Sequence, residues 1–153
     1  MQRKQLDITL PNGTLVSIMQ GDLTKMKTHA VVSSSGADLS HQRGVSKAIA
    51  DACGQRFQIK GKEFVIRTGG LLKEGDTFVQ PADGELAKLG VQCVIHAIAP
   101  LPKKGADVRP LLVKTIREAL KEVENLKFKT IAFPAICAGK LVVMSKYTDF
   151  LSE

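Results

Sequence analysis

The strongest constraint on the fold of this chain is an apolar segment at residues 91–98, in which only Gln92 and His96 are polar. A strand that faces water on one side alternates polar and apolar residues, whereas a continuous apolar strand is buried on both faces. Pro100 and Pro102 end the segment, because proline has no N–H to donate to a neighbouring strand. The segment therefore predicts a central strand in a sheet that helices cover on both faces.

Other strand-like segments lie on both sides of this one. Asn12 and Gly13 separate two β-like runs within residues 4–20, and this dipeptide between apolar runs favours an antiparallel hairpin. Short apolar runs predict further strands at residues 29–33, 75–80 and 129–133. The chain is therefore expected to begin antiparallel and to continue with largely parallel strands.

Helices are predicted between these strands, where apolar residues recur at helical spacing. One begins near Gly44 and ends at Gly54, a second spans residues 62–68, and a third follows an N-cap at Asp107. A short last helix is expected from an apolar face made of Val143, Tyr147, Phe150 and Leu151. The alternation predicts one domain, residues 1–153, of the α/β class, with three α/β/α layers and a mixed, largely parallel central sheet.

Composition limits the classes of partner. The 22 basic and 15 acidic residues give a net charge of +7, which favours polyanions such as RNA. The lysines are dispersed, aromatic residues are 5% and tryptophan is absent, so stacking platforms for single strands are not visible and a solvated basic surface is the favoured interpretation. No apolar run is long enough for a membrane span, and no apolar region follows the basic start as in a signal peptide. We expect no membrane partner and a cytoplasmic or nuclear protein.

The cysteines and histidines do not predict a metal site or a nucleophile. The cysteines lie about forty residues apart without a C-x-x-C pair, at Cys53, Cys93 and Cys137, which favours reduced thiols. The first two are expected in the core, and Cys137 has no base near it in sequence. His29, His41 and His96 lack the spacing of metal ligands. We therefore expect no metal and no catalytic residue.

Three loops marked by glycine follow predicted strands, at residues 21–24, 33–46 and 134–139. In a sheet with parallel central strands, such loops gather at one edge, where α/β proteins bind ligands. At residues 44–46 a glycine also precedes a helix, so that free N–H groups and the positive end of the helix dipole face outward together. Two such loops beside a cleft suit a diphosphate, and Asp22 suits an exocyclic amine such as that of adenine.

Five segments occur in a fixed order between residues 15 and 139. They are Gly-Asp-Leu-Thr at 21–24, Val-Ser-Ser-Ser-Gly-Ala-Asp-Leu at 32–39, Arg-Gly-Val-Ser-Lys-Ala-Ile at 43–49, Val-Ile-His-Ala-Ile-Ala-Pro at 94–100 and Phe-Pro-Ala-Ile at 133–136. Together they resemble the macrodomain family, in the style of macrodomains associated with poly(ADP-ribose) polymerases. The resemblance implies a three-layer α/β/α fold and a cleft for ADP-ribose, with no further cofactor.

The resemblance also assigns positions to the ligand. Asp22 matches the acid that receives the adenine amino group, and Leu23 matches the backbone contact beside it. Residues 44–46 match the loop over the diphosphate and distal ribose, and residues 135–139 match the second phosphate loop. The implied ligand-binding residues are Asp22, Leu23, Ser33, Ser35, Gly36, Gly44, Val45, Ser46, Ala135, Ile136, Cys137, Ala138 and Gly139.

Two of these positions depart from the pattern of hydrolytic family members. The asparagine at the distal ribose is replaced by Gly36, and an aspartate often found after the valine is replaced by Ser46. A hydroxyl is a poor replacement for a carboxylate that positions or activates water. We therefore expect a module that binds ADP-ribose or ADP-ribosylated protein without hydrolysing it.

Two alternatives stay open. One is an ADP-ribosyl hydrolase, and the other is a vestigial cleft on a module that binds protein, RNA or poly(ADP-ribose) through its basic surface. Only residues 140–153 follow the second phosphate loop, whereas the resemblance implies a further strand and helix there. We expect either a shortened form whose last segment replaces them or a partner that covers the sheet edge.

Overall fold

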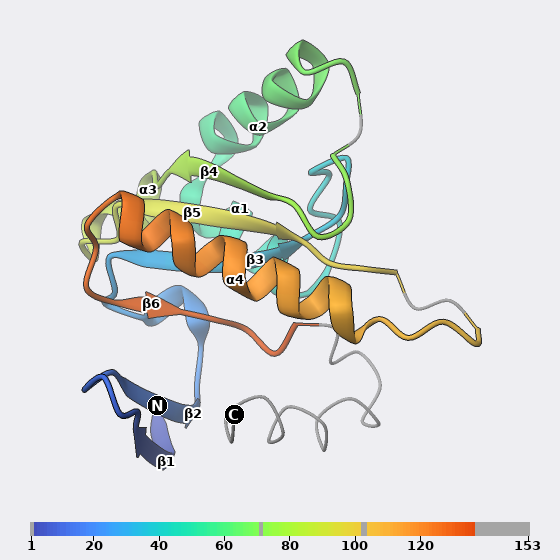
Figure 1. Cartoon of the computed structure of the whole chain (residues 1–153). Coiled ribbons are helices and arrows are strands. Elements are labelled where there is room, and N and C mark those ends of the chain that lie inside the picture. The colour runs from blue at the N-terminus through green and yellow to red at the C-terminus, as the bar shows by residue number, and fades with distance from the viewer. Residues whose placement is uncertain (1, 71, 102–103, 137–153) are drawn as a thin grey trace.

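The computed structural model describes residues 2–70, 72–101 and 104–136. It begins with the predicted hairpin, in which β1 (Arg3–Thr9) pairs antiparallel with β2 (Leu15–Gln20). Gly13 turns the chain at φ 86°, and the Asn12 side chain accepts a hydrogen bond from the Thr14 N–H. The two strands form a sheet of their own, drawn in dark blue on the β6 side of the molecule in Figure 1.

The main sheet has four strands among the described residues, in the order β4-β5-β3-β6. The central strands, β3 (Ala30–Ser35) and β5 (Cys93–Ile98), run parallel, and β6 (Ile131–Ala132) runs parallel to β3. At the other edge, β4 (Thr77–Pro81) pairs antiparallel with β5. The sheet is therefore mixed and largely parallel, and every residue of β5 is buried, as its continuous apolar sequence predicts.

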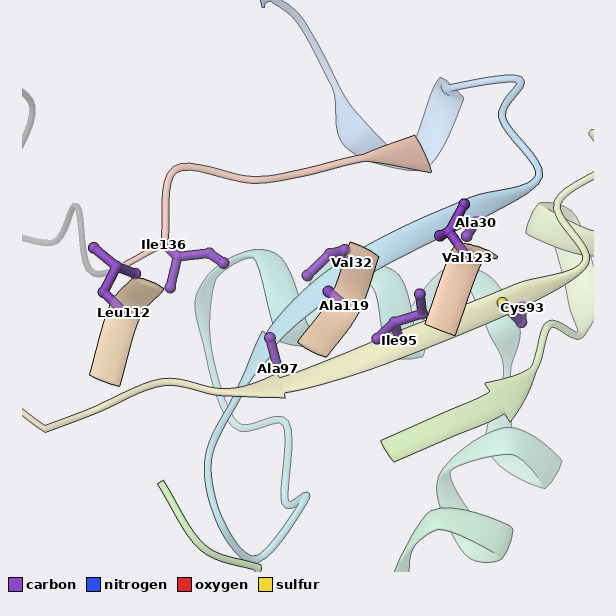
Figure 2. Close-up of a cluster of buried hydrophobic side chains, with 9 residues drawn as sticks. All are labelled: Ala30, Val32, Cys93, Ile95, Ala97, Leu112, Ala119, Val123 and Ile136. Carbon is purple, nitrogen blue, oxygen red and sulfur yellow. The ribbon is translucent and has the colours of Figure 1, made fainter. Parts of the chain in front are cut away.

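One face of this sheet packs against α4 (Arg109–Asn125). Alternate residues of β3 and β5 point to this face, where they meet the apolar stripe of the helix. Figure 2 shows the cluster, which consists of Ala30, Val32, Cys93, Ile95, Ala97, Leu112, Ala119, Val123 and Ile136. This cluster thus joins β3, near the start of the chain, to α4 and to Ile136 at the end of the described residues.

The opposite face is covered by η1 (Leu23–Lys25), α1 (Gly44–Cys53), α2 (Gln55–Arg67) and α3 (Gly84–Lys88). Val31 and Val94 of the sheet meet Ile49 of α1, Phe57 of α2 and Leu86 of α3. A separate cluster contains Leu39, Val65 and Ile98. The predicted three-layer α/β/α architecture is confirmed, with α4 on one side and the α1, α2 and α3 layer on the other (Figure 1).

Several predicted boundaries were wrong. The second helix begins at Gln55 instead of residue 62, and α3 had no counterpart among the predicted elements. Helix α4 has Val108 at its N-cap position, although the predicted cap, Asp107, does accept a hydrogen bond from the Arg109 N–H at 3.0 Å. The predicted strand at 129–133 reduces to two residues. The predicted last helix, at residues 143–151, lies outside the described residues.

In the part of the chain that the structure describes, no helix is both long and apolar enough to cross a bilayer.

Candidate ligand cleft

The parallel strands bring two of the predicted loops to one edge of the sheet. Because β3, β5 and β6 run in the same direction, their carboxyl ends at Ser35, Ile98 and Ala132 lie at the same edge. The β3–α1 loop, residues 36–43, leaves this edge and leads directly into α1. Residues 133–136 leave the same edge after β6. Two of the three expected loops therefore lie at one edge, whereas residues 21–24 follow β2, which belongs to the separate two-stranded sheet. Residues 137–139 of the last loop lie outside the described residues.

The N-terminus of α1 lies at this edge, and the first backbone N–H groups of a helix have no partner within the helix. Its N-cap residue is Arg43, which has extended backbone angles and makes no side-chain capping bond. The first turn holds no acidic residue, although an acid is the usual complement to the positive end of the dipole. Gly44 has φ 68° and is exposed, with no atom within 4 Å of the place a Cβ would take. These features favour an anion in front of the helix.

Asp22 lies at the N-cap of η1, beside α1. Its Oδ1 accepts hydrogen bonds from the Thr24 hydroxyl at 2.7 Å and from the Thr24 N–H at 2.9 Å. These two bonds lower the pKa of Asp22, and the residue is exposed, so that its carboxylate is ionised and accessible at neutral pH. Leu23 is half-buried against the cluster of Val31 and Ile49, which fixes the position of the carboxylate relative to α1.

The loop after β6 is anchored at Ile136. Its side chain is buried beside Leu112 of α4, as Figure 2 shows, whereas Ala135 is exposed. The remaining predicted members of this loop, Cys137, Ala138 and Gly139, lie outside the described residues. The described part of the predicted second phosphate loop, residues 135–136, is thus tied to the core at Ile136.

Ser33 and Ser35, in contrast, lie inside the protein, where they belong to a chain of buried hydrogen bonds. The Phe57 carbonyl accepts from Gln80 Nε2 at 2.7 Å, which turns Gln80 Oε1 toward His96 Nε2 at 2.9 Å. His96 must therefore carry its proton on Nε2 and accept at Nδ1 from the Ser35 hydroxyl, 3.0 Å away. Ser35 Oγ in turn lies 3.0 Å from Ser33 Oγ. The proposed ligand role of these two hydroxyls stays a prediction, and here both hydroxyls are used internally.

Burial keeps His96 neutral. The side chain has no exposed area, and removal from water lowers its pKa to about 3, with His41 acting in the same direction. His96 is the hydrogen-bond partner of the Ser35 hydroxyl. The partner is sixty-one positions away on a neighbouring parallel strand, so no spacing within the sequence indicates it.

Ser46 is also paired with a histidine. Its hydroxyl lies 2.8 Å from His41 Nδ1, and both residues are buried. The His41 ring stacks on His96 at 5.2 Å, and its Nε2 is a buried nitrogen with no hydrogen-bond partner among the described residues. Gly36 is exposed and has the Asp38 carboxylate 3.3 Å from the position of a Cβ. Of the two positions that depart from hydrolytic members, Ser46 thus has a hydroxyl that faces inward, and Gly36 has no side chain.

The cysteines occupy the positions expected of apolar residues. Cys53 and Cys93 are free and buried, and burial raises the pKa of both thiols, that of Cys93 to about 11. Both thiols therefore stay protonated at neutral pH. Within residues 2–136, apart from the gaps given above, His, Cys, Asp and Glu do not gather in groups of three that could hold a metal ion.

A hollow of about 210 Å³ lies elsewhere, between α2 and the end of β4. None of the predicted ligand residues lines it; its lining consists of Arg56, Phe57, Lys60, Gln80, Pro81, Ala82 and Asp83. The Asp83 carboxylate lies 3.9 Å from Arg56, so the positive charge of this hollow is already partly neutralised. The edge where the β3–α1 loop and residues 133–136 lie is therefore the better candidate for an anionic ligand.

Comparison with other sequences identifies relatives of this chain. The family model of the Macro domain matches residues 32–147. An uncharacterised protein of Sulfurisphaera tokodaii is 34% identical over 149 residues, which cover 89% of this chain and 78% of that protein. Human protein mono-ADP-ribosyltransferase PARP14 is 31% identical over 134 residues, which cover 85% of this chain but 7% of that protein. The likeness to PARP14 therefore concerns one domain of a much longer protein.

Solved structures give the same result for the fold. A macrodomain of Oceanobacillus iheyensis with ADP superposes with a TM-score of 0.77 at 26% identity, over 91% of this chain and 70% of that chain. A Trypanosoma brucei macrodomain in complex with ADP-ribose reaches a TM-score of 0.63 at 19% identity, over 78% of this chain and 46% of that chain. The matched sequence, the shared fold and the loop arrangement agree, and this chain belongs to the macrodomain family.

Proposed function

We propose that this chain is a binding module for ADP-ribose or for ADP-ribosylated proteins and that it has no hydrolase activity. The observation that carries the proposal is the uncapped N-terminus of α1 at the carboxyl edge of three parallel strands. Backbone N–H groups there would hold the diphosphate, since an anion is the missing partner of such a helix end. Related structures with ADP and with ADP-ribose support this ligand.

Asp22 would recognise the adenine end of the ligand. Its carboxylate is exposed and ionised, and both of its hydrogen bonds within the chain go to one oxygen, Oδ1. An exocyclic amine of adenine is a donor that such a carboxylate can accept. The half-buried Leu23 holds the carboxylate next to α1.

The proposal that the chain does not hydrolyse ADP-ribosyl bonds rests on the residues Gly36 and Ser46. Activation of water needs a base within hydrogen-bond reach of the reacting atoms. Gly36 offers no side chain, and the Ser46 hydroxyl faces the interior, where it is bonded to His41. A buried, neutral histidine with a lowered pKa is a weak base. We therefore expect no release of ADP-ribose from a modified protein.

Isothermal titration calorimetry with ADP-ribose tests the binding function. We expect binding by the unaltered chain and about tenfold or greater loss in Asp22→Ala, the scale of one charge-assisted hydrogen bond. Glu118→Ala is the matched control, because Glu118 lies on α4 across the sheet and pairs only with Lys121 among the described contacts. Absence of heat at millimolar ADP-ribose would refute the binding function. Equal losses in both variants would refute the role of Asp22.

A hydrolysis assay separates the proposal from the enzyme alternative. An ADP-ribosylated protein incubated with the chain should keep its modification over hours. Release of ADP-ribose that disappears in Ser46→Ala would show hydrolase activity and place Ser46 in the mechanism. Titration with RNA and poly(ADP-ribose) across a salt series tests the remaining alternative, since binding through dispersed charge weakens steeply as salt rises.

A further inference from the structure

The β3–α1 loop, residues 36–43, is held to the core by two of its own side chains. Leu39 is fully buried with Val65 and Ile98, and His41 is buried against Phe57 and His96. Both Leu39 and His41 have positive φ, 50° and 51°, a conformation that costs a residue with a Cβ about 1 to 2 kcal/mol. The loop keeps this conformation because burial of the two side chains offsets the cost.

His41 makes contacts with three separate elements. Ser46 of α1 meets its Nδ1 at 2.8 Å, the His96 ring of β5 stacks on it at 5.2 Å, and Phe57 of α2 lies 6.5 Å away between ring centres. His41 therefore fastens the loop to α1, to α2 and to β5. Gly36 and Arg43 are the first and last residues of the loop, and both are exposed at the edge that the ligand would occupy.

The site accommodates a neutral imidazole and not a charged one. The Nε2 atom is buried without an acceptor among the described residues, so a proton added to the ring would leave a charged N–H unsatisfied. Burial lowers the pKa of His41, the Lys62 charge on α2 acts in the same direction, and the Asp38 carboxylate on the loop opposes them. His96, Phe57 and Ser46, which also face the ring, are neutral. Protonation therefore favours a state in which the ring has left the core.

We propose that His41 is a positioning residue, whose neutral ring holds the β3–α1 loop in the conformation that presents Gly36 and the α1 N-terminus to the ligand. The loop loses this anchor on acidification, and ligand affinity falls with it. The inference rests on the proposed binding of ADP-ribose, because the loop forms one side of that cleft. His41 acts through the loop and does not touch the ligand.

The test is the pH dependence of ADP-ribose affinity, measured by calorimetry at about pH 7.5 and about pH 5.5. Affinity of the unaltered chain should fall about fivefold, since the proton and the ligand favour different states of the loop. In His41→Phe, which keeps a neutral ring against His96, affinity should stay nearly constant over this range. In His41→Ala it should be about tenfold lower at both pH values, because the loop must be ordered on binding.

His29→Gln is the matched control, because His29 is half-buried just before β3, at the opposite end of that strand from the β3–α1 loop, and bonds to Thr130. It should keep the pH profile of the unaltered chain. The proposal is overturned if the unaltered chain binds equally well at both pH values, if His41→Phe shows the same pH dependence, or if His41→Ala binds as tightly as the unaltered chain.

Amide hydrogen exchange tests the same anchor without a ligand. Exchange at residues 36–43, corrected for the intrinsic effect of pH, should be faster in His41→Ala and at about pH 5.5, whereas the amides of β5 should not change. If the unaltered chain fails to bind ADP-ribose but the loop responds in this way, the proposed function is wrong and the anchor stands. Unchanged exchange of the loop in His41→Ala overturns the anchor itself.

Discussion

At the scale of single residues, the unusual feature is a buried polar cluster between two apolar ones. It contains Ser33, Ser35, His41, Ser46, Gln80 and His96. Among the described residues, the buried side-chain nitrogen and oxygen atoms of this cluster have hydrogen-bond partners, with the exception of His41 Nε2. A nearly satisfied cluster of this kind specifies one arrangement of the core, since any shift leaves a polar group unpaired.

The cluster predicts that stability depends on pH between about 5 and 7. His96 titrates near its ordinary value of 6.5 when unfolded but at about 3 when folded, because of burial. Between these values the unfolded chain binds a proton that the folded chain does not, so the free energy of unfolding is greatest above about pH 6.5. It falls by about 1.4 kcal/mol for each unit below that. His41 contributes in the same direction.

Urea denaturation at about pH 7, 6 and 5 measures this dependence. The carboxylates whose pKa is lowered, Asp22 and Asp38, lose their contribution only below about pH 4, so they do not interfere in this range. In His96→Gln, which keeps an amide to bond with Gln80 and Ser35, the slope should shrink to the part due to His41. A free energy of unfolding that is constant from pH 5 to 7 would contradict the buried neutral assignment.

At the scale of elements, the N-terminus of α1 lacks a capping side chain, which lowers the stability of the free protein but leaves backbone donors for the proposed ligand. Arg43 has the extended backbone of an N-cap residue but makes no cap. Replacing it with aspartate should stabilise the free protein by about 1 kcal/mol, because the carboxylate accepts from the free N–H groups. The same carboxylate should weaken ADP-ribose binding at least tenfold, since it occupies the donors and repels the diphosphate.

Thermal unfolding and calorimetry of Arg43→Asp measure the two effects, with Arg43→Ser as the uncharged comparison. Arg43→Ser should stabilise similarly and weaken binding less. If Arg43→Asp is more stable and binds ADP-ribose as well as the unaltered chain does, the ligand does not sit at this helix end.

The elements themselves show which patterns can be predicted from sequence. Helix α1 could be predicted from its apolar periodicity and from Gly54, which has φ 90° at the helix end. Strand β5 could be predicted from its continuous apolar sequence. Helix α2 begins earlier than predicted, because it follows Gly54 directly and its buried residues include Gly61, which weakens the apolar signal. Helix α3 has five residues, too few for a helical period to be visible.

At the scale of the whole molecule, the sheet topology brings the predicted site together. The positions of Gly36, Gly44 and Ala135 at one edge follow from parallel strands, which the apolar segments indicate. The inward orientation of Ser33, Ser35 and Ser46 could not be predicted, because it depends on His41, His96 and Gln80 in other segments. The sequence therefore indicates which loops lie at the same edge of the sheet. Tertiary packing decides which of their side chains are exposed and can contact a ligand.

The most direct test of the account is an NMR titration of the ¹⁵N-labelled chain with ADP-ribose. We predict chemical-shift changes at Asp22 and Leu23, in the β3–α1 loop with Gly44 and Val45, and at residues 133–136. The amides of α4 and of the hollow between α2 and β4 should not change. Shifts centred on α2 or α4, or none at millimolar ADP-ribose, would contradict the assignment of this edge as the ligand cleft.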